Sequence, residues 1–469
     1  MKFTKIVCTI GPASKSEEVL RKLVQAGMNV ARLNFSHGTH DEHADLIKTI
    51  RKVSEELKEP VAILQDLQGP KIRVGELPKE GVTLVSGGQV VFTTGTPDIP
   101  NLKLPVTYEK LHQDVKAGER ILLDDGLLSA QVLSVDGHEV TCKVIDGGKL
   151  TSHKGVNFPD SKLTVSSITE KDMQDLQFGV AQQVDYVALS FVRHADEIHT
   201  LRKLINTYAE GQGIATQENA SPTCIIAKIE KGEGVDNIDS IIEAVDVIMV
   251  ARGDLGIETP AEGVPLIQKM LIRKCLAASK PVIVATQMLD SMIRNPRATR
   301  AEVSDVANAI IDHTDAVMLS GESAGGSYPV EAVITMSAVA AETERSPEND
   351  LRIPQREAAL SMSDALAEMV NLLVRETDAK AVVSIGASVS TIRQISRFRP
   401  EKPIYAVMKD GKSCRQTNLS WAVRPMVGDN LDSAFSILKS DGKLAAGDQV
   451  IVVTANSTGA AEDVRISKV

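Results

Sequence analysis

The stretch CIIAKIE, residues 224–230, is an almost continuous apolar run that ends in a lysine and a glutamate. A short run of this kind, rich in isoleucine, predicts a strand buried on both faces, as in a parallel sheet. Successive side chains of a strand point to opposite faces, so Lys228 and Glu230 share one face. The stretch therefore predicts a buried strand that carries two opposite charges at its carboxyl end.

Seven further runs of this kind occur along the chain, and most are separated by segments with the apolar spacing of helices. Eight buried strands that alternate with helices predict an α/β fold with a closed parallel (β/α)8 barrel. A doubly wound open sheet is the alternative. The strands are expected at Thr4–Ile10, Val30–Asn34, Val61–Asp66, Val184–Ser190, Cys224–Ile229, Val247–Val250, Val282–Thr286 and Ala316–Leu319.

The ends of the first helix can be predicted from its sequence. Ser14 and Glu17 have the spacing of a capping box, and an apolar face follows at residues 19–24. Gly27 comes directly after that face, where glycine commonly ends a helix.

The connection after the third strand is far longer than a barrel loop. It is rich in β-type runs, and Asp-Gly pairs at 125–126, 136–137 and 146–147 have the composition of two-residue hairpin turns. We therefore expect residues 71–167 to form an inserted, β-barrel-like domain, and residues 1–70 and 168–344 to form the barrel.

A second α/β alternation follows a polar stretch at residues 346–350. A helix is expected at Ser363–Glu376, and strands at Ala381–Ile385, Ile404–Val407 and Gln449–Thr454. Residues 345–469 are therefore expected to form an open-sheet α/β domain.

The overall composition excludes several classes of protein. A formal net charge of −10 argues against a protein that binds nucleic acid or an anionic membrane. No apolar run reaches the roughly 20 residues of a membrane span. The five cysteines are scattered without paired spacing, which favours a reducing, cytoplasmic location.

Polar residues follow the predicted strands at their carboxyl ends, where barrel enzymes carry their chemistry. Glu230 and Asp254 together form the oxygen-only pair that Mg²⁺ takes, and Lys228 suits an anionic oxygen. Taken alone, Lys228 and Glu230 could equally form a strand-end ion pair, and Asp254 a simple turn. The other residues noted at these ends are Arg32, Asn34, Ser36, His37, Asp66, Arg252, Gly253, Thr286, Gln287, Ser320 and Glu322.

Six segments of the chain resemble the pyruvate kinase family, of the bacterial type without an N-terminal extension. They occur in the family's order and spacing and together cover nearly the whole chain. The segments are Thr9–Pro12, Met28–Gly38, Ile226–Glu230, Met249–Gly256, Ala285–Leu289 and Leu319–Glu322.

The resemblance implies a reaction and a set of roles. The family transfers the phosphoryl group of phosphoenolpyruvate to ADP, giving pyruvate and ATP in the final step of glycolysis. By motif, Arg32 and Lys228 bind that phosphoryl group, while Glu230 and Asp254 hold Mg²⁺ or Mn²⁺. The inserted domain is then a lid, and the C-terminal domain serves regulation and assembly of a homotetramer.

Further residues take roles through the same resemblance. Gly253, Asp254 and Thr286 contact the substrate. The enolate left by the transfer must then be protonated, and we expect a relay of hydroxyls and water that includes Thr286 and Ser320. The nucleotide contacts are Asn34, Ser36, His37, Arg73 and Lys154.

The run after the third strand departs from the family pattern. Many members read DTKGPEIR and need K⁺, whereas this chain reads DLQGPKIR over residues 66–73. Asn34, Ser36, Asp66 and Leu67 keep the outline of the monovalent cation site. We hypothesise that the ammonium of Lys71 replaces K⁺ and makes the activity K⁺-independent; the alternative is a solvated loop lysine.

The expected effector region also departs from the pattern. Members with a sugar-phosphate site often carry Ser-Gly-Lys/Arg-Ser before a helix, but residues 388–391 read SVST. Activation by fructose 1,6-bisphosphate is therefore not expected, and either another phosphorylated effector or none remains open.

Two other functions fit part of this pattern. A Mg²⁺-dependent barrel lyase or aldolase acting on a pyruvate-like acid would use Glu230 and Asp254 but has no need of Arg73, Lys154 or a lid. A metabolite-sensing protein would keep the fold without turnover.

Overall fold

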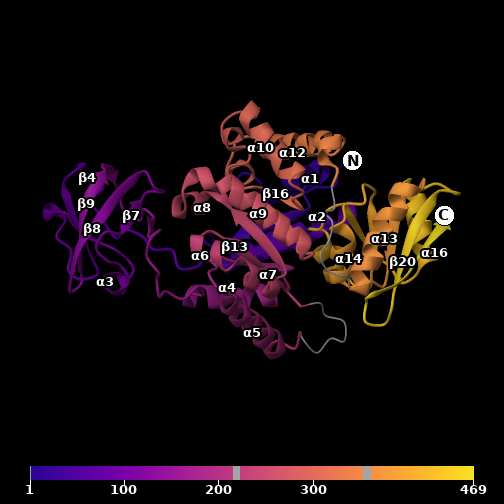
Figure 1. The fold of residues 1–469 in the computed structure, drawn as a ribbon, viewed down its shortest axis with the longest axis horizontal. Coiled ribbons are helices and arrows are strands. Elements are labelled where there is room, and N and C mark those ends of the chain that lie inside the picture. The colour runs from indigo at the N-terminus through magenta and orange to yellow at the C-terminus, as the bar shows by residue number, and fades with distance from the viewer. Residues whose placement is uncertain (1, 215–221, 352–360) are drawn as a thin grey trace.

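The computed structural model describes residues 2–214, 222–351 and 361–469. Its three parts lie in a row along the longest axis, as Figure 1 shows. The inserted β domain is at one end, the barrel is in the centre, and the C-terminal sheet is at the other end. The barrel is therefore in a position to contact both of the other parts.

Eight parallel strands form a closed barrel in the order β1-β16-β15-β14-β13-β12-β3-β2. The predicted (β/α)8 barrel is confirmed, and the open sheet is excluded for this part of the chain. The strands are β1 (Lys5–Thr9), β2 (Val30–Asn34), β3 (Ala62–Asp66), β12 (Tyr186–Leu189), β13 (Cys224–Ile229), β14 (Val247–Ala251), β15 (Val282–Ala285) and β16 (Ala316–Leu319).

Helices cover the outside of the barrel and bury its outward-facing side chains. None of the described helices is long and apolar enough to cross a membrane. The helices are α1 (Glu17–Ala26), α2 (His40–Leu57), α4 (Glu170–Ala181), α5 (Ala195–Gly211), α6 (Gly232–Asp236), α7 (Ile238–Ala244), α8 (Arg252–Glu258), α9 (Val264–Ala277), α10 (Arg300–Ile311), α11 (Gly321–Ala324) and α12 (Pro329–Thr343).

The start of α1 differs from the prediction. Ser16, not Ser14, is the N-cap, and its side chain accepts the N–H of Val19. Ser14 is buried in the preceding loop, where its hydroxyl accepts the N–H of Gly11 at 3.1 Å. The predicted end is correct: Gly27 has φ 116° and follows the last helical residue.

The β domain has its own hydrophobic core and shares no residue of it with the barrel. Six strands pair in the order β11-β7-β8-β9-β5-β6, and β10 pairs with β4. Its elements are β4 (Val82–Leu84), β5 (Gln89–Thr93), β6 (Lys103–Pro105), α3 (Leu111–Asp114), β7 (Arg120–Leu123), β8 (Leu128–Asp136), β9 (Glu139–Asp146), β10 (Gly148–Leu150) and β11 (Val156–Asn157).

The predicted hairpin turns are right in part. β8 and β9 pair up to Asp136 and Glu139, so a two-residue turn begins at Gly137. β7 and β8 also form a hairpin, but the pair Leu123–Leu128 leaves a four-residue loop. The third predicted hairpin, at residues 146–147, is wrong, because β10 pairs with the distant β4.

The C-terminal part is an open sheet in the order β19-β18-β17-β20-β21, with hydrophobic clusters on both faces. A short 3-10 turn, Pro347–Asn349, lies in the polar stretch before it. The elements are α13 (Met362–Glu376), β17 (Ala381–Ile385), α14 (Val389–Ser396), β18 (Ile404–Met408), α15 (Gly411–Thr417), β19 (Val423–Val427), α16 (Leu431–Ser440), β20 (Gln449–Ala455) and β21 (Ala461–Lys468).

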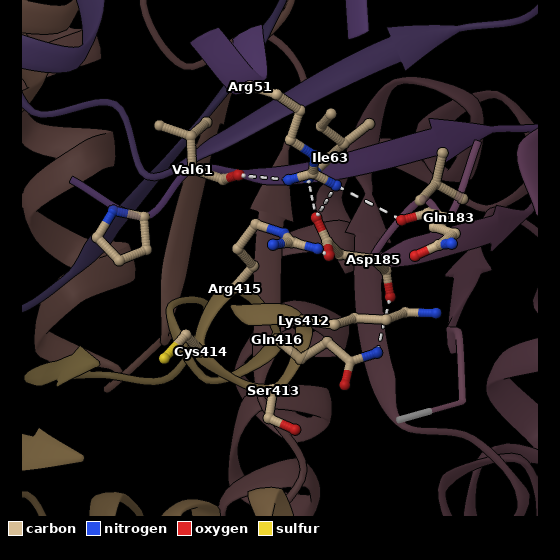
Figure 2. Close-up of polar contacts among 12 residues, drawn as sticks. Arg51, Val61, Ile63, Gln183, Asp185, Lys412, Ser413, Cys414, Arg415 and Gln416 are labelled. Carbon is tan, nitrogen blue, oxygen red and sulfur yellow. Dashed lines mark hydrogen bonds and ion pairs between the residues drawn. The ribbon is translucent and has the colours of Figure 1, made fainter. Parts of the chain in front are cut away.

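The C-terminal domain closes the amino-terminal end of the barrel. Leu419, which follows α15, is fully buried in the cluster that fills the barrel interior. Beside it, the carboxylate of Asp185 accepts from Arg51 of α2 at 2.9 Å and from Arg415 of α15 at 2.8 Å, as Figure 2 shows. The opposite, carboxyl end of the barrel faces the β domain and holds the candidate site.

Candidate active site

The interior face of the barrel changes from apolar to polar toward its carboxyl end. Buried apolar residues such as Val7, Leu64 and Ile226 fill the interior. Two residues further along six of the eight strands, the same face carries a polar side chain, because side chains repeat every second residue; β14 and β15 carry Ala251 and Ala285 at this level. The polar residues placed in this way are Thr9, Arg32, Asp66, Ser190, Lys228 and Ser320.

Lys228 lies at the centre of this polar group. Its ammonium is 2.9 Å from Oε1 of Glu230 and 3.4 Å from Oδ1 of Asp66. It also donates to the hydroxyl of Ser190 at 2.8 Å. The side chain is only 12% exposed, and both carboxylates are 1% exposed. The predicted ion pair with Glu230 therefore exists, and Asp66 makes it a three-residue cluster.

The charges of this cluster shift each other's pKa. Burial by itself lowers the pKa of Lys228, but Asp66 and Glu230 together raise it above its usual range. Burial raises the pKa of Asp66, but Lys228 and Arg32 outweigh it and hold that pKa low. The lysine is thus a fixed cation and Asp66 a fixed anion.

Arg32 adds a second cation at the same place. Its Nε donates to Oδ2 of Asp66 at 2.6 Å, and its Nη1 donates to the hydroxyl of Thr9 at 2.8 Å. Asp66 therefore holds both cations predicted to bind a phosphoryl group. An anion with several oxygens is the ligand that such a pair of cations suits.

Glu230 and Asp254 have the chemistry of a Mg²⁺ site. Glu230 also accepts the N–H of Phe191 at 2.6 Å. Burial raises the pKa of Glu230 to about 7, with Lys228 opposing that shift and the charge of Asp254 adding to it. Among the described residues no three His, Cys, Asp or Glu side chains cluster to hold a metal. Two carboxylates completed by water and substrate oxygens are enough for Mg²⁺, so the residues fit this ion.

Thr286 and Gly253 meet at the same end of the barrel. The N–H of Gly253, in the first turn of α8, donates to the hydroxyl of Thr286 at 2.8 Å. On the next strand, the hydroxyl oxygen of Ser320 is buried and has no hydrogen-bond partner in the described part of the chain. Buried hydroxyls rarely stay unpaired, so Ser320 has bonding capacity for a ligand or water.

The predicted nucleotide residues fall into two groups. At the end of β2, the side-chain oxygen of Asn34 accepts the N–H of Ser36 at 3.1 Å, and His37 follows, exposed. In the β domain, Arg73 pairs with Gly155, next to Lys154.

The two cations of the β-domain group already have partners. Arg73 donates to the carbonyl of His153 at 2.7 Å, and the ammonium of Lys154 is 2.7 Å from Oδ1 of Asp124. No hydrogen bond or ion pair between described residues joins this group to the residues at the end of β2.

Leu67 and Lys71, which belong to the predicted monovalent cation site, lie in different surroundings. Leu67 is buried, and its carbonyl accepts the hydroxyl of Ser190 at 2.8 Å. Lys71 is exposed, and its N–H donates to the carbonyl of Gly69. Within residues 2–214, 222–351 and 361–469, no hydrogen bond or ion pair engages its ammonium.

A cavity of about 440 Å³ lies between the barrel mouth and the β domain. Phe191 and Asp254 line it from the barrel, and Lys71 lines it next to the β domain. At its edge, the side chain of Asn157 in the β domain donates to Glu258 of α8 at 2.9 Å. Its volume is typical of small-molecule sites.

Four residues of this site were given no role at the level of sequence. Thr9 is the last residue of β1, and Ser190 directly follows β12. The rule that barrel enzymes carry their chemistry at strand ends would therefore have found both. Glu322 accepts the N–H groups of Ser320 and Leu289 at 2.7 and 3.0 Å, and it thereby joins two strand-end loops. Arg252, next to Gly253, had no sequence signal beyond its position.

The chain is similar to known proteins over nearly its whole length. Residues 1–333 match the family model described as "Pyruvate kinase, barrel domain", and residues 364–469 match "Pyruvate kinase, alpha/beta domain". The chain is 45% identical to a pyruvate kinase of Staphylococcus epidermidis over 98% of this chain and 78% of that protein. A Staphylococcus aureus pyruvate kinase is 44% identical with the same coverage. A crystal structure of a pyruvate kinase from Cryptosporidium parvum superposes with a TM-score of 0.91 at 34% identity, over 100% of this chain and 96% of that one.

Proposed function

The chain belongs to the pyruvate kinase family, and from this membership we propose that the cluster around Lys228 is where phosphoenolpyruvate gives up its phosphoryl group to ADP. One observation carries the proposal. Two cations, Lys228 and Arg32, are held side by side by the buried carboxylate of Asp66 at the barrel mouth.

The proposed chemistry is charge neutralisation and positioning. A transferring phosphoryl group spreads negative charge over its oxygens and needs little covalent help. Lys228 and Arg32 bind these oxygens, and their pairing with Asp66 keeps both side chains in place before the substrate arrives. A site organised in advance stabilises the transition state without the cost of reorienting its groups.

Glu230 and Asp254 are the residues that hold Mg²⁺. When bound, this ion neutralises charge on the phosphoryl group and on the enolate oxygen. Thr286 lies at the substrate, and Thr286 with Ser320 belongs to the relay that protonates the enolate. The unpaired Ser320 hydroxyl supports this role, because it can bond a water or the substrate.

The β domain, residues 71–167, is proposed as a lid that brings Arg73 and Lys154 to the nucleotide. Asn34, Ser36 and His37 approach the same nucleotide from the barrel. The cavity between the two parts supports this, since it leaves room for the lid to close. Closure excludes water, so that ADP and not water accepts the phosphoryl group.

A coupled assay with lactate dehydrogenase, phosphoenolpyruvate and ADP tests the proposed site. Lys228→Met should lower kcat about 10²–10³-fold, because it removes a preorganised charge from the transition state. Lys269→Met is the matched control, since it removes a surface ion pair with Asp312 and should leave kcat unchanged. A Lys228→Met enzyme within tenfold of the wild-type rate would contradict the proposal. Release of pyruvate from phosphoenolpyruvate without ADP would mean that water accepts the phosphoryl group, and it would also contradict the proposal.

We also propose that Lys71 replaces K⁺. Its exposed ammonium lies in the loop that follows Asp66, at the edge of the cavity, and no described partner holds it elsewhere. Lid closure can then carry it toward the Asn34, Ser36, Asp66 and Leu67 group.

Replacing KCl by a non-activating salt at matched ionic strength tests this idea. The wild-type rate should stay within about twofold, as one fixed charge substitutes for another. Lys71→Glu should become K⁺-activated, whereas Lys79→Glu, at an exposed lysine of the same domain, should not. A several-fold activation of the wild type by KCl would overturn the idea.

The chain is further proposed to work as a cytoplasmic homotetramer. Exposed apolar side chains on α13, with Met362 at 76% and Leu372 at 56%, suit burial against another subunit. All five cysteines are free and buried, as in proteins of a reducing compartment. Light scattering should give four times the mass of one chain, and a monomer at micromolar concentration would contradict this assembly.

A further inference from the structure

Thr286 reaches the barrel mouth out of phase with its own strand. β15 ends at Ala285, which faces the barrel interior. Because side chains alternate along a strand, residue 286 would point to the helix layer if the strand continued. Its hydroxyl instead lies 2.8 Å from the N–H of Gly253 at the site. The side chain gets there because the backbone turns sharply at this residue.

The turn uses an unfavourable backbone conformation. Thr286 has φ 70° and Gln287 has φ 53°, so two successive residues other than glycine are left-handed. For a β-branched residue such as threonine this region is rarely populated. Strained backbone of this kind persists where surrounding contacts hold it, and it is concentrated at functional sites.

Arg252 supplies those contacts. Its Nη2 donates to the carbonyl of Thr286 at 2.8 Å and approaches that of Gln287 at 3.4 Å. Its Nη1 donates to Oδ1 of Asp305 on α10 at 2.7 Å. The Arg252 side chain is 13% exposed, and its bonds to Thr286 and Asp305 are partly buried. One guanidinium therefore joins both carbonyls of the turn to a fixed carboxylate.

The next residue in the chain holds the side chain of the same threonine. Gly253 donates its N–H to the hydroxyl of Thr286, which in turn donates to the carbonyl of Ala285 at 2.6 Å. Arg252 and Gly253 thus fix the backbone and the hydroxyl of Thr286 together. If Arg252 served only to link α8 to α10, its contact with Asp305 would be enough. Its contacts with the carbonyls of Thr286 and Gln287 would then have no explanation.

We propose that Arg252 is a positioning residue for the reaction, which keeps the 286–287 turn left-handed and so keeps the Thr286 hydroxyl at the substrate. The inference rests on the proposed role of Thr286. Lysine cannot replace this arginine, because a single ammonium cannot span two carbonyls and a carboxylate as a planar guanidinium does.

Four variants test the inference: Arg252→Gln, Thr286→Ala, their double variant, and Arg202→Gln as control. Arg202 makes the same kind of contacts, to a carbonyl at 3.1 Å and to Asp246 at 3.0 Å, at the other end of the barrel. Each variant is assayed for kcat, for both KM values, and for exchange of the pyruvate methyl protons with deuterated water. Urea unfolding reports the stability of each.

Arg252→Gln should lower kcat and the exchange rate about 10–100-fold, since a displacement of about 1 Å at a reacting centre costs that much. Its KM for ADP should stay within about twofold. The double variant should be no slower than Thr286→Ala, and Arg202→Gln should keep the wild-type kcat even if it loses as much stability.

The possible contrary results separate the two proposals. If Thr286→Ala keeps the wild-type kcat and exchange rate, the proposed role of Thr286 fails, and the inference fails with it. If Thr286→Ala is slow but Arg252→Gln is fast, the inference alone is overturned. It is also overturned if the two losses multiply in the double variant, or if Arg202→Gln is equally slow.

Discussion

Asp66 controls the charge balance at the barrel mouth. Its sequence motif places it among the monovalent cation ligands, whereas the structure pairs its carboxylate with Arg32 and Lys228. Without Asp66, two largely buried cations would face one another, and among the described residues Glu230 would be the one carboxylate left in an ion pair with them. The residue is therefore part of the phosphate-binding arrangement as the structure has it, and a role toward a monovalent cation stays a prediction.

His313 is a second residue whose charge depends on its surroundings. It follows α10, and its backbone has a φ of 68°. Its carbonyl accepts a hydrogen bond from the guanidinium of Arg399. Burial lowers the pKa of His313 to about 4; Arg399 adds to this shift, and Asp315 and Asp350 oppose it. The folded protein thus keeps this histidine neutral at a pH where the unfolded chain already protonates it.

His313 should make the protein less stable in acid. Since the folded pKa lies below the unfolded one, stability is complete above about pH 6.5 and is lost as the pH falls toward 4. At pH 5 the loss is about 2 kcal/mol relative to pH 7.5. Urea unfolding at both pH values should show that His313→Asn, which tolerates the left-handed backbone, loses about 2 kcal/mol less than the wild type. Equal losses would contradict the prediction.

At the scale of elements, the amino end of α4 holds both connections to the β domain. Asp172 is fully buried, and one of its oxygens accepts the N–H and hydroxyl of Thr169 at 2.9 and 2.7 Å. Its other oxygen accepts the N–H of Gly69 at 3.2 Å. Residue 69 leads into the inserted domain and residue 169 follows it, so one capping carboxylate fixes both ends of this domain.

Asp172→Ala should loosen this junction. It leaves buried donors without an acceptor, which costs about 1–3 kcal/mol in urea unfolding. Trypsin should also cleave faster after Lys71. Glu42→Ala is the control, because Glu42 makes the same capping box with Thr39 of α2 at an exposed site and joins no second loop. If both variants show the same cleavage rate, Asp172 does not hold the junction between the barrel and the β domain.

At the scale of the whole molecule, the barrel and the C-terminal domain share a core, whereas the β domain has its own. Leu419 is buried among the interior side chains of the barrel. Figure 2 shows how Arg415 from the C-terminal domain and Arg51 from the barrel converge on Asp185, which is fully buried. Removing either arginine would leave this carboxylate poorly compensated in a buried place.

The barrel and the C-terminal domain should therefore unfold together. Hydrogen exchange in urea should show β1 and β17 losing protection in one step and β8 in another, because shared cores couple their unfolding. Leu419→Ala should lower the stability of the first step by about 2–5 kcal/mol. Leu127 is 74% exposed in the β domain. Leu127→Ala should therefore change the stability of the first unfolding step little. Separate steps for β1 and β17 would contradict the shared core.

The sequence by itself determined the barrel strands and most of the residues at their carboxyl ends. A strand buried on both faces must be apolar along its length, and its two-residue period assigns each side chain to a face. Both properties are local, so the residue pattern alone is enough to place Lys228, Arg32 and Asp66 at the carboxyl ends of their strands. The end of α1 at Gly27 was predictable for the same reason.

Only the tertiary structure decided which of these groups meet. β10 pairs with a strand more than sixty residues away, and Ser14 bonds to a loop instead of capping a helix. Likewise, the contact of Arg252 with the turn at Thr286 joins two strand ends that are distant in sequence. Distances between such segments depend on how the whole chain packs, and no local pattern of residue types encodes them.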